Sequence, residues 1–167
     1  MARVYLGLGS NIEPGANLRL AVRELRARYG TLDLSPVYRS AAVGFAGDDF
    51  LNLVAGMDSQ ASAESIHDVI EEIHTLSGRQ RGSNKFGART LDIDLLLYGD
   101  QVIDHPKFAI PRKDVLEYGF VLRPLADLAP DLLHPQTGRT MAAHWCEAEP
   151  GAEPLELVAM DLEADQA

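Results

Sequence analysis

Two aspartates stand one residue apart in RTLDIDLLLY, residues 89–98, a stretch whose other residues suit a buried strand. Side chains at positions i and i+2 of a strand share a face, so Asp92 and Asp94 project together while Ile93 and Leu95 point to the opposite face. Two carboxylates this close repel each other unless one is protonated or a cation neutralises them. Oxygen ligands with no His or Cys beside them favour Mg²⁺, so the pattern predicts a magnesium site.

The segment before this strand is basic and rich in glycine. Residues 73–91 contain Arg79, Arg81, Lys85 and Arg89 and no acidic residue. An isolated pair of aspartates in a strand is more often a pair of exposed side chains that face water, and that alternative stays open. Guanidinium groups next to paired carboxylates are nevertheless the composition expected where Mg²⁺ and arginines together neutralise a polyphosphate.

The composition is that of one globular domain. The chain has 167 residues and a single cysteine, Cys146, so neither a disulfide framework nor a cysteine zinc site is expected. The first residues lack the pattern of a secretory signal, and no segment is apolar over the ~18 residues that a membrane span requires. We expect a cytoplasmic, monomeric protein that does not associate with membranes.

The charge is unevenly distributed along the chain. Residues 147–167 contain seven acidic residues and no Lys or Arg, which leaves −3 of the net charge of −10 for residues 1–146. We expect residues 1–146 to form the domain and residues 147–167 to be a solvated acidic tail. A negative net charge argues against non-specific nucleic-acid binding, and one basic segment in an acidic protein favours a small anionic ligand.

Patterns of aliphatic residues predict the order strand, helix, strand, strand, helix, strand. The expected strands are residues 3–10, 31–40, 48–59 and 91–100, the expected helices are residues 14–30 and 62–78, and short helices are expected within residues 112–130. Pro36 indicates an edge strand or a bulge. Ser62 is expected to cap the second helix, and Gly30 and Gly78 to mark helix ends. This order is typical of ferredoxin-like α+β folds, with a mostly antiparallel sheet and helices on its faces.

Other nucleotide-binding and catalytic motifs find no support. GLGSNI at residues 7–12 begins like a dinucleotide fingerprint, but Ile12 replaces its third glycine, and no G-K-[ST] of a phosphate-binding loop occurs. The five histidines show no metal-ligand spacing. His67 and His74 lie seven residues apart on one helix face, where we expect a polar or partly buried structural role.

Five segments carry a resemblance to one family. They are YLGLGSN, SPVYRSAAVG, FLNLVAGM, FVLRPLADLAPDLLHP and, the most specific, GRQRGSNKFGARTLDIDLLLYGD. Over residues 4–140 the chain resembles the 6-hydroxymethyl-7,8-dihydropterin pyrophosphokinases. The resemblance implies transfer of pyrophosphate from ATP to the pterin alcohol, with release of AMP, in folate biosynthesis. It also implies two Mg²⁺ ions, with ATP and the pterin as small-molecule partners.

The same resemblance implies roles for the charged residues. Asp92 and Asp94 match the aspartates that bind two Mg²⁺ ions between themselves and the ATP phosphates. Arg79 and Arg81 match arginines that face the triphosphate, and Arg89 matches an arginine on a mobile loop that closes over it. The alcohol could lose its proton either to Asp94 as acceptor or through binding of the alcohol to Mg²⁺. Arg79, Arg89 and Asp94 are the candidate catalytic residues.

A pterin site is implied as well. The matching positions are Ser40, Ala41, Val43, Phe50, Asn52 and Phe120. In the family the asparagine side chain hydrogen-bonds the pterin, and the two aromatic rings stack on it. A planar ring rich in donors and acceptors suits aromatic faces and an amide. For each aromatic residue alone, a role in the core stays an equally good explanation.

Four residues depart from the family pattern. Arg112 and Lys113 stand where a His and often a Tyr are usual, Tyr118 replaces a common arginine, and His74 replaces a usual glutamate. Arg112 and Lys113 are cationic donors and are still expected to meet phosphate. Two hypotheses follow: an active, Mg²⁺-dependent pyrophosphokinase, or a paralogue that binds pterin or nucleotide without efficient transfer and acts as a binding or regulatory protein.

Overall fold

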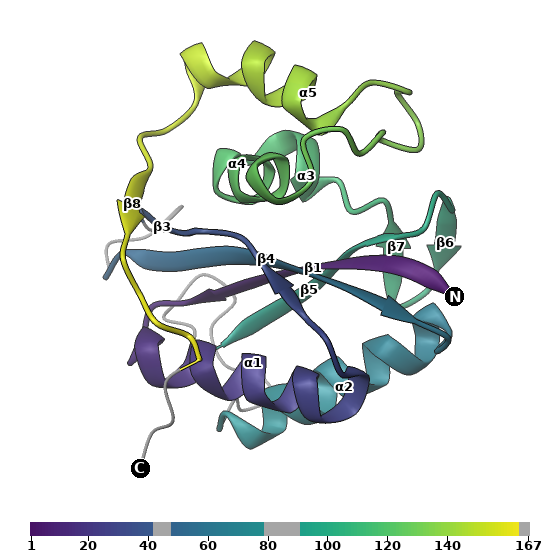
Figure 1. The fold of residues 1–167 in the computed structure, drawn as a ribbon, viewed down its shortest axis with the longest axis vertical. Helices are drawn as coiled ribbons and strands as arrows, with labels where there is room; N and C mark the ends of the chain where they lie inside the picture. The colour runs from purple at the N-terminus through teal and green to yellow at the C-terminus, as the bar shows by residue number, and fades with distance from the viewer. Residues whose placement is uncertain (42–47, 79–90, 164–167) are drawn as a thin grey trace.

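An antiparallel sheet lies between two layers of helices (Figure 1). The structure is a computed structural model that describes residues 1–41, 48–78 and 91–163. The strands of the large sheet are β1 (Ala2–Ser10), β2 (Asp33–Leu34), β3 (Val37–Ser40), β4 (Phe50–Ser59), β5 (Asp92–Tyr98) and β8 (Glu156–Val158). The order across it is β5-β1-β4-β3-β8, and β2 pairs with β4. All of these pairings are antiparallel, so the predicted ferredoxin-like α+β fold is confirmed.

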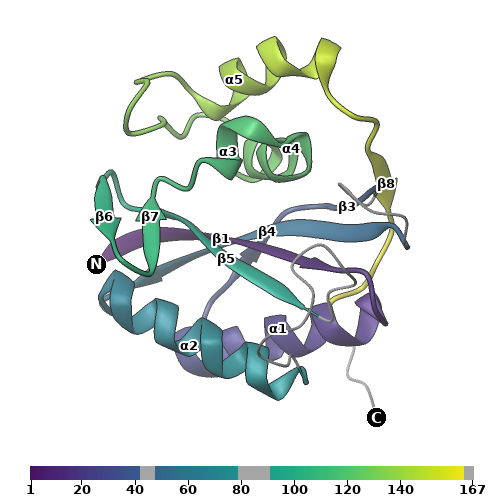
Figure 2. The same ribbon diagram turned by 180° about the vertical axis from the view of Figure 1, so that it is seen from behind.

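The helices cover the sheet on both faces. Helices α1 (Pro14–Tyr29) and α2 (Ala63–Leu76) lie on one face, and α3 (Asp114–Glu117), α4 (Gly119–Leu128) and α5 (Met141–Ala148) on the other (Figures 1 and 2). A 3₁₀ turn, η1 (Glu149–Gly151), follows α5. A small hairpin of β6 (Ile103–His105) and β7 (Phe108–Ile110) follows β5. No helix of the described part of the chain is long and apolar enough to cross a bilayer.

The predicted helix signals have physical counterparts. The Ser62 hydroxyl accepts a hydrogen bond of 3.1 Å from the backbone N–H of Ser65 and caps α2 as predicted. Gly30 follows α1 with φ of +83°, and Gly78 lies two residues after the end of α2 with φ of +86°. Both φ angles lie in the left-handed region that glycine adopts without strain, so these glycines end the helices.

The strand β5 separates two hydrophobic cores. Ile93 and Leu95 pack with α1 and α2 on one face, which leaves Asp92 and Asp94 on the face of α4. The pairing of β1 with β5 then shifts by one residue, so both Leu96 and Leu97 pack with α4 in the second core. This β-bulge allows one short strand to present two carboxylates and still contribute to both cores.

Pro36 marks a bulge, which was one of the two predicted alternatives. The pairs Leu34↔Ala55 and Tyr38↔Asn52 differ in register by one residue, with Ser35 and Pro36 between them. Ser35 keeps the interrupted ladder satisfied, because its hydroxyl accepts a hydrogen bond of 2.8 Å from the N–H of Val54. Beyond the bulge, β3 pairs with β8 on its other side.

The prediction of a solvated tail after residue 146 is wrong for residues 147–163. Helix α5 continues through Ala148, β8 adds to β3, and Leu162 is buried in the core beside α1. The last described residues thus run from the α5 layer past the sheet edge to α1 (Figure 1). The acidic composition of residues 147–167 predicted a solvated segment, because composition does not report the pairing of β8 with β3.

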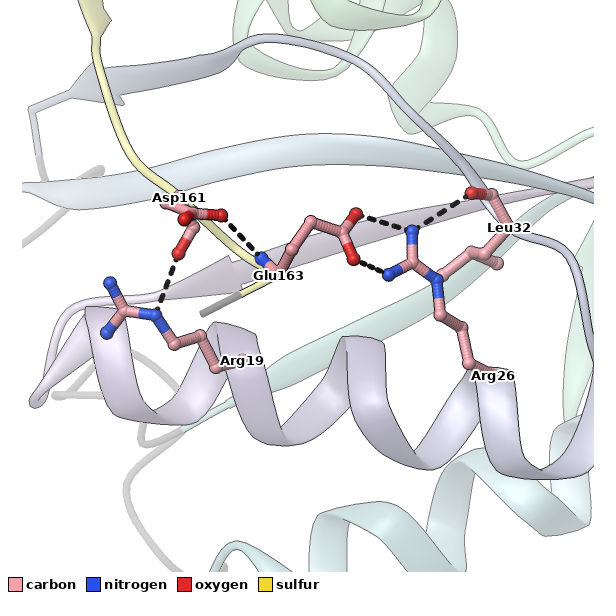
Figure 3. Close-up of polar contacts among 5 residues, drawn as sticks. All are labelled: Arg19, Arg26, Leu32, Asp161 and Glu163. Atoms are coloured by element: carbon pink, nitrogen blue, oxygen red, sulfur yellow. Dashed lines mark hydrogen bonds and ion pairs between the residues drawn. The ribbon is translucent and has the colours of Figure 1, made fainter. Parts of the chain in front are cut away.

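Basic residues of α1 contact Asp161 and Glu163 of this segment (Figure 3). Arg26 forms an ion pair with Glu163 and donates a hydrogen bond of 3.3 Å to the carbonyl of Leu32. Arg19 Nε donates a hydrogen bond of 2.9 Å to the backbone carbonyl of Asp161. One carboxylate and one backbone carbonyl of this segment therefore bind arginines of α1.

Candidate active site

A cavity of about 470 Å³ lies along the sheet at its β5 edge. It is bounded by β1, β3, β4 and β5, by α2 and α4, and by the β6–β7 hairpin. Eight predicted site residues line it: Ser40, Ala41, Phe50, Asn52, Asp92, Asp94, Arg112 and Phe120. The fold therefore gathers residues that are up to 80 positions apart in the sequence into one cavity.

The pairing of β1 with β4 and β5 places Asn52 and Asp92 on either side of Gly9. Gly9 of β1 pairs with Asp92 of β5 on one side and with Asn52 of β4 on the other. A Cβ atom at Gly9 would lie 2.9 Å from Asn52 Oδ1, closer than side chains tolerate. Glycine is therefore required at this position if the Asn52 amide is to keep its place over β1.

The amide of Asn52 is held by a neighbouring strand. Asn52 Nδ2 donates a hydrogen bond of 2.8 Å to Ser40 Oγ, and both residues are buried. Phe50 lies directly opposite Ser40 in the pairing of β3 with β4. Hydrogen bonding fixes the orientation of the amide, so the Asn52 oxygen can accept from a ligand without reorganisation.

The second aromatic ring comes from the other side of the cavity. Phe120, the second residue of α4, lines the cavity and stacks on Tyr118 with ring centroids 5.0 Å apart and an interplanar angle of 23°. Tyr118 is not among the residues that line the cavity. The tyrosine at this departure from the family pattern therefore supports an aromatic ring of the site.

Arg112 provides positive charge beside the paired carboxylates. Its Nη2 lies 3.6 Å from Asp94 Oδ1, and its Nε lies 3.3 Å from Asp114 Oδ2. A backbone hydrogen bond of 2.9 Å from the Arg112 N–H to the Leu96 carbonyl anchors this segment to β5. Burial opposes the charged form, but Asp94, Asp114 and Asp92 outweigh it and raise the pKa of Arg112.

His74 is buried and makes a structural contact, in line with the polar or partly buried structural role expected for it. It is 5% exposed, and its Nε2 accepts a hydrogen bond of 2.9 Å from the backbone N–H of Ile93. His67 lies on the same helix, lines the cavity and has its ring centroid 5.4 Å from that of Phe108.

Some lining residues were missed by the sequence interpretation. They are Glu71, Lys107, Phe108 and Asp114. Lys107 lies in the turn of the β6–β7 hairpin and Phe108 begins β7, and three-residue strands give too short an alternation to recognise. Asp114 follows Arg112 closely in the sequence, and this proximity of opposite charges was the one available signal.

The other predicted site residues are not placed in the cavity. Val43, Arg79, Arg81 and Arg89 lie outside the described residues. Lys113 is exposed and is not among the lining residues, although it adjoins Arg112.

The carboxylate oxygens of the site suit a hard cation that takes its remaining ligands from water and substrate. Among residues 1–41, 48–78 and 91–163 no group of three or more His, Cys, Asp or Glu could hold a metal ion. Asp92 and Asp94 offer carboxylate oxygens on one face of β5 and border a cavity large enough for further ligands. This donor set fits Mg²⁺, which keeps waters and takes substrate phosphates as ligands.

Fold and cavity together define a ferredoxin-like α+β domain with a ligand site at its edge strand. The sequence model of 7,8-dihydro-6-hydroxymethylpterin-pyrophosphokinase (HPPK) matches residues 5–130. Over 137 residues the chain is 39% identical to the 2-amino-4-hydroxy-6-hydroxymethyldihydropteridine pyrophosphokinase of Pseudomonas aeruginosa, covering 80% of this chain and 84% of that protein. The protein of the same name from Methylorubrum extorquens is 37% identical, covering 80% and 86%. The chain therefore belongs to the HPPK family of pyrophosphokinases, as the resemblance predicted.

Solved structures share the fold at low sequence identity. Wild-type HPPK-DHPS of Plasmodium falciparum with pteroate has a TM-score of 0.71 and 14% identity, covering 87% of this chain and 42% of that one. A structure of HPPK-DHPS in complex with substrates has a TM-score of 0.73 and 10% identity, covering 90% and 44%. These similarities support the fold, and this chain spans less than half of those longer chains.

Proposed function

We propose that this chain transfers pyrophosphate from ATP to 6-hydroxymethyl-7,8-dihydropterin, giving the pterin diphosphate and AMP, in folate biosynthesis. Membership of the HPPK family supports the reaction. The structural observation that carries it is the row Asp92, Gly9 and Asn52 across three strands, which sets paired carboxylates beside a buried, oriented amide. Nothing in the comparisons favours the alternative of a paralogue that only binds its ligands.

The pterin occupies the part of the cavity between β4 and α4 in this proposal. Asn52, oriented by Ser40, hydrogen-bonds the edge of the ring, while Phe50 and Phe120 contact its faces. Ala41 lines this side as well, and Val43 is assigned to the pterin site from the resemblance alone. An oriented amide and rigid aromatic rings hold a flat heterocycle with little loss of side-chain entropy.

Asp92 and Asp94 hold two Mg²⁺ ions in this proposal. Bound there, Mg²⁺ would neutralise charge on the phosphates of ATP and orient them towards the pterin alcohol. Mg²⁺ dependence and the number of ions rest on the resemblance and on the carboxylate pair. Asp94 is the candidate acceptor for the proton of the alcohol.

The cationic residues bind the phosphates of ATP in this proposal. Arg112 already lines the cavity beside Asp94 and can donate two parallel hydrogen bonds to phosphate. Arg79, Arg81 and Arg89 have the same role by resemblance, whereas Lys113, which is exposed and does not line the cavity, is assigned no phosphate contact. Charge that develops on the phosphoryl oxygens is thereby stabilised more than the ground state.

A product assay tests the reaction. The protein is mixed with ATP, Mg²⁺ and 6-hydroxymethyl-7,8-dihydropterin, and the nucleotides are separated by chromatography. We expect AMP and the pterin diphosphate in equal amounts, and no AMP when the pterin or Mg²⁺ is omitted. Release of ADP would contradict the reaction class, and absence of any product would favour the binding paralogue. Sedimentation of the purified protein would test the predicted monomer, and the cytoplasmic location stays a prediction.

A further inference from the structure

The residue between the two aspartates has a backbone N–H that the sheet does not use. β5 is the edge strand, with β1 on one side only. In an antiparallel pair alternate residues direct their N–H groups away from the neighbouring strand, and at an edge these groups need another partner. The N–H of Ile93 is such a group, and its partner is the side chain of His74 on α2.

Each ring nitrogen of His74 has a neighbouring group. Nε2 lies 2.9 Å from the Ile93 nitrogen and accepts its hydrogen, so the ring proton belongs on Nδ1. Nδ1 lies 3.5 Å from Oε1 of Glu71, one helical turn earlier. His74 is 5% exposed, and His74 and Glu71 both line the cavity. A carboxylate, an imidazole and a backbone N–H thus form a chain that ends between Asp92 and Asp94.

We propose that His74 is a positioning residue that fixes the backbone of β5 between the two aspartates, with Glu71 orienting the imidazole. The proposal rests on the proposed function in that Asp92 and Asp94 bind metal there. The spacing of two carboxylates on alternate residues depends on the backbone angles of the residue between them. A hydrogen bond from that residue to a buried side chain keeps those angles, and with them both carboxylates, in one arrangement.

Three substitutions and a matched control separate this role from a general structural one. His74→Ala removes the acceptor, whereas His74→Gln places an amide oxygen that can accept the same N–H. Glu71→Gln removes the charge behind the ring and leaves the helix surface otherwise unchanged. Glu72→Gln is the matched control, because Glu72 is the adjacent carboxylate and forms an exposed ion pair with Arg28 instead.

The direct measurement is hydrogen exchange at the Ile93 amide of the complete protein without ligands. We expect exchange at least about tenfold faster in His74→Ala, an intermediate change in Glu71→Gln, and wild-type protection in His74→Gln and Glu72→Gln. If Ile93 exchanges at the wild-type rate in His74→Ala, the proposal is overturned. If His74→Ala does not fold, the Ile93 exchange rates of Glu71→Gln and Glu72→Gln are compared instead. Equal Ile93 exchange rates in these two variants would also overturn the proposal.

The second measurement is of metal affinity. A kinetic titration gives the Mg²⁺ concentration at which AMP release is half-maximal. Electron paramagnetic resonance gives the binding of Mn²⁺ to the protein with ATP. We expect His74→Ala to weaken metal binding about tenfold or more, with the KM for the pterin unchanged, and His74→Gln to restore it. A loss of rate with wild-type metal dependence would overturn the proposal. Wild-type protein that releases no AMP contradicts the proposed function instead, and the Ile93 amide still tests the positioning contact.

Discussion

Arg112 Nη2 lies 3.6 Å from Asp94 Oδ1, so a cation of the chain itself stands beside the paired carboxylates. Asp94 lies on β5, and Arg112 lies in the segment after β7. The side chain of Arg112 is 38% exposed and that of Asp94 is 40% exposed. At this exposure the pair adds little to stability, so its arrangement matters more for the charge of the cavity. Arg112 offsets part of the repulsion between Asp92 and Asp94 and leaves both facing the site.

Removing either carboxylate is the first test of the site. We expect Asp92→Asn and Asp94→Asn to lower AMP release at least about a hundredfold, because each removes a charged metal ligand while keeping the side-chain shape. The melting temperature should be unchanged or slightly higher, since a like-charge pair is relieved. Activity close to that of the wild type in both variants would show that the metal binds elsewhere.

Arg112 and Lys113 differ in their relation to the cavity and make a matched pair. Arg112→Gln should raise the KM for ATP about tenfold or more, because a charge-assisted hydrogen bond to phosphate is worth about 1.5–3 kcal/mol. Lys113→Gln should change it less than about twofold, because Lys113 is exposed and does not line the cavity. Initial rates at varied ATP concentration measure both. An equal effect of the two substitutions would place Lys113 at the nucleotide too.

Gly9 and Gly7 test the spacing between the strands. A methyl group at Gly9 would lie 2.9 Å from Asn52 Oδ1, whereas one at Gly7 would make ordinary contact at 3.5 Å with Leu96. We expect Gly9→Ala to raise the KM for the pterin about three- to tenfold, the cost of one displaced hydrogen bond, without changing that for ATP. Gly7→Ala is the control and should leave the pterin KM near that of the wild type. Equal pterin KM values in both variants would remove Asn52 from the proposed site.

The sequence predicted the elements whose signal is local. Aliphatic runs located β1, β4 and β5, and the serine and glycines at the ends of α2 and α1 located the helices, because caps and periodicity depend on neighbouring residues. The i, i+2 rule placed Asp92 and Asp94 on one face without knowledge of the fold.

The features that were missed depend on partners distant in sequence. The bulge at Leu96 arises from the pairing with β1, and the contact of Ile93 with His74 arises from the packing of α2 against an edge strand. The acidic composition of the tail predicts a solvated segment, whereas Arg26 of α1 pairs with Glu163 and Arg19 donates to the backbone carbonyl of Asp161. None of these relationships leaves a pattern within a short window of sequence.

His134 should make stability depend on pH. Burial, and next the neighbouring His144, lower the pKa of His134 from its usual value, so folding favours the neutral ring. The stabilisation is complete above the unfolded pKa of about 6.5 and is lost as the pH falls below it. His134→Asn keeps an acceptor for the Gln136 N–H, which donates to His134 Nδ1 over 3.2 Å, but does not titrate. Melting temperatures between about pH 7.5 and 5.5 should fall more steeply for the wild type than for this variant, and parallel curves would contradict the assignment.

The packed tail can be tested with two leucines five residues apart. Leu162 is 7% exposed and belongs to the core beside α1, whereas Leu157 on β8 is 64% exposed. We expect Leu162→Ala to lower the free energy of unfolding by about 2 kcal/mol, at the low end for buried leucine because the site lies near the chain end. Leu157→Ala should change it by less than about 0.5 kcal/mol. Urea unfolding of both variants measures the difference. A solvated tail would make the two substitutions equally neutral, whereas a tail that packs as described makes only Leu162→Ala destabilising.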